Sequence, residues 1–213
     1  MSFHVYARRV RDPGLPVERR GSALGSAVVL YCPFGFHLTH TYLSHYGDTR
    51  RDPQAMTAAL AALQRSRDAY IAEWEAFSRR RKHQKRTAHR RTPSAADQAW
   101  MSAPRWPGPD LHHAHHTLVR HLTTAQDFPA HGPLEEELSR AEKAVTTHAQ
   151  HYLATNAPGI ESAPAMEPLL PALRAAAGRY QGQRGVHSPE TQAERLWLTA
   201  ELIHADTTRP HTP

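Results

Sequence analysis

Residues 53–91 read PQAMTAALAALQRSRDAYIAEWEAFSRRRKHQKRTAHRR and contain the longest regular pattern of apolar residues in the chain. Apolar side chains recur in it at alternating spacings of four and three residues, with Arg67 at the one charged position of the repeat: Met56, Leu60, Leu63, Tyr70, Trp74 and Phe77. This spacing places them on one side of an α-helix, and frequent alanine adds helix propensity. Asp52 and Pro53 are a favourable N-cap and first helical residue. We therefore expect a long helix with an apolar seam over 56–77.

The end of this stretch, residues 79–91, is strongly basic. It has no acidic residue and eight cationic ones: Arg79, Arg80, Arg81, Lys82, Lys85, Arg86, Arg90 and Arg91. The whole chain has 26 Lys and Arg against 20 Asp and Glu, so its net charge of +6 is concentrated here. A run of like charges repels itself but becomes favourable beside a polyanion, because bound phosphates release counterions.

The basic run predicts an accessory nucleic-acid-binding protein that contacts the phosphates of DNA or RNA. No zinc-finger, RNP or P-loop motif accompanies residues 79–91, so binding would be non-specific in base sequence. Three alternatives stay open for this run: a solvated helix end, an acidic partner protein and an anionic membrane.

The densest group of potential metal ligands comprises Cys32, His37, His40 and His45. Zinc prefers nitrogen and sulfur ligands in tetrahedral sites, so zinc is the cofactor that this group suggests. A zinc-stabilised module or a small zinc enzyme is therefore the first alternative function. The spacing matches no zinc-finger pattern, and packing of a half-buried cysteine among aromatic and histidine rings is the competing interpretation.

A second histidine pair, His112 and His116, lies one helical turn apart within HHAHH. This is a real metal-ligand spacing, but His113 stands where the metalloprotease motif has glutamate. The chain has 17 histidines, and abundant Ala, Arg and Pro accompany them. Such a composition is bacterial-like and fits codons rich in G and C. The frequent histidines, this pair included, can therefore reflect codon composition instead of metal binding.

The distribution of apolar residues along the chain predicts a mainly α fold. We expect an irregular bundle of four or five helices with a short β-containing N-terminal segment. Strands are expected at 3–8 and 27–32, with a loop between them. Besides the central helix, further helices are expected over 110–126, 133–155, 168–180 and 188–204. The segments within one compact domain are 1–50 (β and loop), 51–91 (long helix), 92–109 (Pro-rich linker), 110–205 (helical bundle) and 206–213 (disordered tail).

Other sequence features limit the function classes. Cys32 is the single cysteine, so no internal disulfide forms, and no segment has the length of a membrane span. A soluble, cytoplasmic protein is expected. No nucleotide-binding loop, hydrolase elbow or metalloprotease motif is present, which favours a binding protein over an enzyme. The second alternative is a helical scaffold that forms homo-oligomers through the 56–77 seam.

Overall fold

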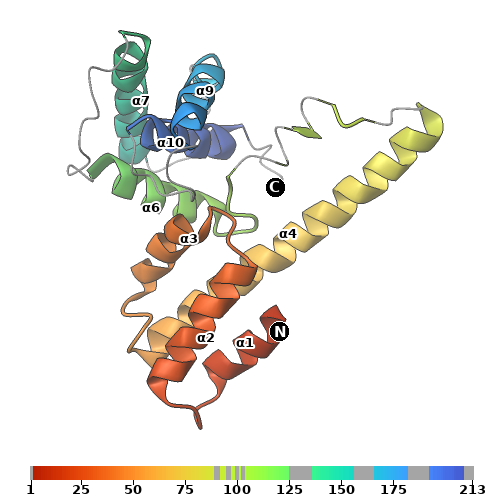
Figure 1. Cartoon of the computed structure of the whole chain (residues 1–213), viewed down its shortest axis with the longest axis vertical. Coiled ribbons are helices and arrows are strands. Elements are labelled where there is room, and N and C mark those ends of the chain that lie inside the picture. The colour runs from red at the N-terminus through yellow and green to blue at the C-terminus, as the bar shows by residue number, and fades with distance from the viewer. Residues whose placement is uncertain are drawn as a thin grey trace. The chain divides into compact units, whose positions relative to one another are not determined.

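The predicted long helix begins at Asp52, whose carboxylate Oδ1 accepts a hydrogen bond from the Gln54 backbone N–H at 2.8 Å. It is α4 (Pro53–Thr87), 35 residues long, with proline in its first turn (Figure 1). This cap satisfies one of the N–H groups that every helix start leaves without a partner. The expected start of the helix and its N-cap are confirmed.

The computed structural model describes residues 2–88, 92–94, 97–98, 101, 104–124, 136–155, 166–181 and 192–208. Over these ranges the chain is helical and contains no strand, which confirms the mainly α fold. None of the described helices has both the length and the apolar character needed to cross a bilayer. The chain divides into two compact units: unit 1 is Met1–Pro33 with Leu43–Asp110, and unit 2 is Phe34–Tyr42 with Leu111–Pro213.

Unit 1 contains α1 (Phe3–Arg11), α2 (Val17–Leu30), the short 3-10 helix η1 (Ser44–Tyr46) and α4. Val10, Val28, Met56, Leu60 and Leu63 are fully buried at 0% exposure. The first half of the 56–77 seam therefore packs against α1 and α2 of the same chain. Arg67 continues this packing, because its guanidinium lies 4.8 Å from the centre of the Phe3 ring.

The predicted N-terminal strands are wrong, because residues 3–8 lie in α1 and residues 27–30 end α2. The side chains of Phe3, Ala7 and Val10 are buried, and their four–three spacing is that of a helix rather than a strand. Gly21, in the segment that we expected to be a loop, lies inside α2. A Cβ there would meet the carbonyl oxygen of Arg50 at 3.1 Å, so glycine lets α2 approach that backbone closely.

The return segment, residues 92–110, runs back along α4 in its described parts. Three of its charged side chains pair with α4 in reverse chain order: Asp97 with Arg80, Arg105 with Glu73, and Asp110 with Arg65. Trp106 is fully buried. Gly108 has a φ of +99°, and a Cβ there would lie 3.2 Å from the Ala69 Cβ, so both its backbone conformation and its position favour glycine.

Unit 2 contains most of α3 (Phe36–Leu43) and α6 (Leu111–Thr124), α7 (Glu136–Thr155), α9 (Leu170–Gln181) and α10 (Gln192–Thr207). α10 packs against α6, α7 and α9 (Figure 1). Each of the four expected C-terminal helices is present within the described residues. α10 continues to Thr207, so its last turn enters the segment that we expected to be a disordered tail.

Candidate functional site

The basic half of α4 divides into paired and exposed side chains. Arg81 is buried, with 7% exposure. Its Nη1 donates to Gln84 Oε1 at 2.7 Å and lies 3.8 Å from Asp97 Oδ2. Arg80 donates to Asp97 Oδ1 at 2.9 Å, and its guanidinium lies over the ring of Phe77. These two arginines therefore hold the return segment on α4.

Hydrogen bonds with Ser94 hold the Asp97 carboxylate in position to pair with these arginines. Its Oδ2 accepts from the Ser94 backbone N–H at 3.2 Å, and the Asp97 backbone N–H donates to Ser94 Oγ at 3.1 Å. The hydrogen bond from the Ser94 N–H, followed by that from Arg80, lowers the pKa of the Asp97 carboxyl. The carboxylate is therefore charged at neutral pH and opposite two arginines.

The cationic face consists of Arg79, Lys82, Lys85 and Arg86, all exposed on α4. Lys82, Lys85 and Arg86 form no ion pair with any other described residue. The Nη1 of Arg79 is 3.7 Å from Glu75 Oε2, and both side chains are largely exposed, so this contact is weak. Arg90 and Arg91, which we also predicted to bind nucleic acid, lie outside the described residues.

The predicted zinc cluster is not assembled in the described part of the chain. No three His, Cys, Asp or Glu side chains there are grouped so that they could hold a metal ion. Burial raises the pKa of the Cys32 thiol, which disfavours the thiolate that zinc requires. His37 and His40 each contact the ring of Phe36, and His45 contacts Tyr46, as in the competing packing interpretation.

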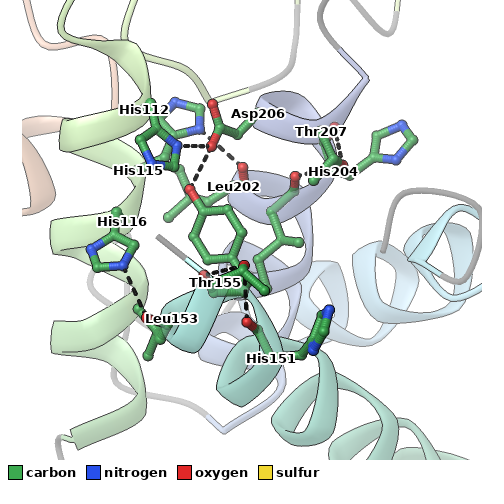
Figure 2. Close-up of polar contacts among 12 residues, drawn as sticks. His112, His115, His116, His151, Leu153, Thr155, Leu202, His204, Asp206 and Thr207 are labelled. Atoms are coloured by element: carbon green, nitrogen blue, oxygen red, sulfur yellow. Dashed lines mark hydrogen bonds and ion pairs between the residues drawn. The ribbon is translucent and has the colours of Figure 1, made fainter. Parts of the chain in front are cut away.

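A polar cluster that the sequence did not reveal joins three helices of unit 2 around Asp206 (Figure 2). Asp206 is buried, and its Oδ2 accepts from Tyr152 Oη at 2.6 Å and from His112 Nδ1 at 2.5 Å. The three residues come from α10, α7 and α6 respectively. Burial, and then the Asp206 carboxylate, raises the pKa of Tyr152, so the phenol remains a donor.

His116 lies beside this cluster and is almost fully buried. Its Nε2 is 3.4 Å from the Leu153 carbonyl oxygen, and its Nδ1 is 3.5 Å from Arg120 Nη2. Arginine can only donate, so this arrangement requires a neutral imidazole with its proton on Nε2. Burial lowers the pKa of His116, which favours the same neutral form.

The His112 and His116 rings are neighbours, with centroids 5.9 Å apart, so the helical spacing was interpreted correctly. Their nitrogens are nonetheless used differently, because His112 binds a carboxylate and His116 a carbonyl oxygen. Tyr152 and Asp206 were missed. Tyr152 lay on the apolar side of its helix, and Asp206 fell in the expected tail.

The cluster has the groups needed for proton transfer, because a carboxylate that orients His112 leaves its Nε2 as an acceptor. Its geometry also explains the packing of unit 2, since one buried carboxylate with two donors joins α6, α7 and α10. A buried acid needs such partners to remain charged. We assign this structural role to the cluster.

Comparisons with protein-family models, curated proteins and solved structures all find no match.

Of the two sites, the cationic face is the one whose side chains are all exposed, whereas His112 of the Asp206 cluster is only partly exposed. Asp206, Tyr152 and His116 are buried and bonded to one another or to backbone. Charge that is exposed and not balanced nearby attracts an oppositely charged partner. The cationic face is therefore the candidate surface for contact with an anionic ligand.

Proposed function

We propose that this protein is an accessory nucleic-acid-binding protein that contacts phosphates through the cationic face of α4. The observation that carries the proposal is that Lys82, Lys85 and Arg86 are exposed and have no carboxylate partner among the described residues. The sequence from 76 to 91 contains no acidic residue. A helix of this kind concentrates positive charge along a line, which suits a linear polyanion.

Only some of the cationic residues in 79–91 are available to bind phosphate. Arg80 and Arg81 are engaged by Asp97, and breaking that contact would leave a charge without its partner. We therefore assign phosphate contact to Arg79, Lys82, Lys85 and Arg86, and a structural role to Arg80 and Arg81. Lysine and arginine contacts of this kind position a nucleic acid but carry no base specificity.

The first prediction concerns the triple variant Lys82→Gln, Lys85→Gln, Arg86→Gln. We expect its affinity for a DNA or RNA oligomer to fall on the order of tenfold at about 0.1 M salt. Each lost phosphate contact also removes close to one from the slope of log affinity against log salt concentration, so the slope should flatten by about two to three. Fluorescence anisotropy over a salt series measures both quantities.

A matched control is Arg8→Gln, Arg19→Gln, Arg50→Gln, which removes the same charge from exposed positions elsewhere in unit 1. We expect this control to keep most of the wild-type slope, because its arginines are not on the cationic face. Equal losses in the two variants would show that only net charge matters. The cationic face would then have no special role.

A further inference from the structure

An exposed aromatic surface lies on α4 immediately before the cationic face. Trp74 is 42% exposed, and Tyr70 and Ile71 are each 37% exposed. The rings of Tyr70 and Trp74 are nearly parallel, at 22°, with centroids 6.3 Å apart. By contrast, Phe77 and Trp106 of the same unit are buried. Beside the helices of unit 1, Tyr70, Ile71 and Trp74 thus remain partly exposed.

The aromatic surface and the cationic face share one side of α4. Trp74, Ser78, Lys82 and Lys85 are separated by four, four and three residues, which is the spacing of one helical side. At 1.5 Å per residue, Trp74 and Lys82 are about 12 Å apart along the axis. Glu75 is adjacent to this line, where its Oε2 lies 3.7 Å from Arg79 Nη1 in a weak, exposed contact. A short length of one strand can therefore span both surfaces.

We infer that the nucleic acid bound by this face is single-stranded, with a base stacked on the exposed part of Trp74 and phosphates on Lys82 and Lys85. This inference rests on the proposed function. Base faces are available in a single strand but are covered by their neighbours in a duplex. Stacking on an aromatic side chain tolerates any base, which agrees with a surface that has no base-reading pattern.

A nucleic acid accounts for the neighbouring charge better than an apolar partner does. A second copy of the chain packed in parallel on this surface would bring another cationic face toward this one, and like charges repel. A single strand presents both π-faces and phosphates, which match the aromatic surface and the cationic face in turn. The two adjacent surfaces then bind one ligand.

The test compares Trp74→Ala with wild type on three ligands: a single-stranded thymidine oligomer, a duplex of equal length and inorganic polyphosphate. We expect Trp74→Ala to lose roughly tenfold in affinity for the single strand and to bind polyphosphate unchanged. Trp74→Phe should recover most of the loss, since it restores an aromatic face. Phe36→Ala removes an exposed aromatic ring from unit 2 and is the matched control. Circular dichroism checks that each variant is folded.

Tryptophan fluorescence gives a second readout. We expect the single strand to quench the wild-type signal and to quench Trp74→Phe much less. Equal affinity of wild type and Trp74→Ala for the single strand, or tighter binding of duplex, overturns the inference while the proposed function stands. Light scattering that shows a dimer dissociated by Trp74→Ala also overturns it. Absence of salt-dependent binding to all three ligands rejects the proposed function itself.

Discussion

The hydrogen bonds of individual histidines in this chain depend on partners that are far away in the sequence. The one-turn spacing of His112 and His116 could be interpreted from α6 alone, and their rings are indeed neighbours. What each nitrogen binds could not be predicted, because Asp206 and Leu153 lie on other helices. The same holds for the predicted zinc ligands, since a metal site depends on convergence in space and not only on ligand density.

The neutral, buried state of His116 leads to a prediction about pH. Because burial lowers its pKa, the unfolded chain takes up a proton near pH 6.5 while folded His116 stays neutral. Its contribution to stability is thus present above about pH 6.5 and is lost as the pH falls toward its lower folded pKa. We expect His116→Gln, whose amide can still donate to the Leu153 carbonyl, to lose less stability between about pH 7.5 and 5.5 than wild type does. Urea unfolding at each pH measures the difference.

His121, on the same helix and exposed, provides the control for this measurement. His121→Gln removes a histidine without removing a buried one, so its pH profile should follow wild type. If His116→Gln and wild type lose equal stability over the same interval, the burial of His116 has no role in acid sensitivity.

At the scale of elements, α4 shows what a sequence pattern can and cannot predict. The 4–3 repeat of apolar residues extends over many turns, and the N-cap marks where the helix begins. Both indicate the same helix, and the structure confirms that helix and its start. In contrast, six residues (3–8) are too few to distinguish the two-residue apolar repeat of a strand from the 3.6-residue repeat of a helix. For this reason we predicted a strand where the structure has α1. The ion pairs of the return segment could not be predicted, because they join positions far apart in the chain.

The two halves of α4 should differ in local stability. Residues 53–66 are covered by α1 and α2, whereas most side chains of 79–87 are exposed and carry like charges. We expect amide hydrogen exchange to be slow in the first half and fast in the second, because exposed helical hydrogen bonds open with little cost. Mass spectrometry of peptides from each half measures this. Addition of the thymidine oligomer should slow exchange over 74–87 and not over 53–66, and uniform protection along α4 would contradict this prediction.

On the scale of the whole molecule, the two units interrupt each other in the sequence. Residues 34–42 belong to unit 2, although the segments on both sides of them belong to unit 1. Within unit 2, the ring of Phe34 lies 5.4 Å from that of His115, and Tyr42 lies 6.1 Å from His113. Most of α3 is therefore part of the C-terminal helical unit, and no single cut of the chain separates the two units.

This arrangement predicts that damage to α3 acts on unit 2. Leu38 is 4% exposed in α3, and Leu38→Ala should cost about 2–5 kcal/mol through the cavity that it leaves. We expect hydrogen exchange in that variant to become faster in α6 and α10 and to change little in α1 and α2. Leu60→Ala, which removes a fully buried leucine from unit 1, is the matched control and should give the opposite pattern. If both variants accelerate exchange equally everywhere, the chain unfolds as one cooperative body. The two units then do not unfold independently of each other.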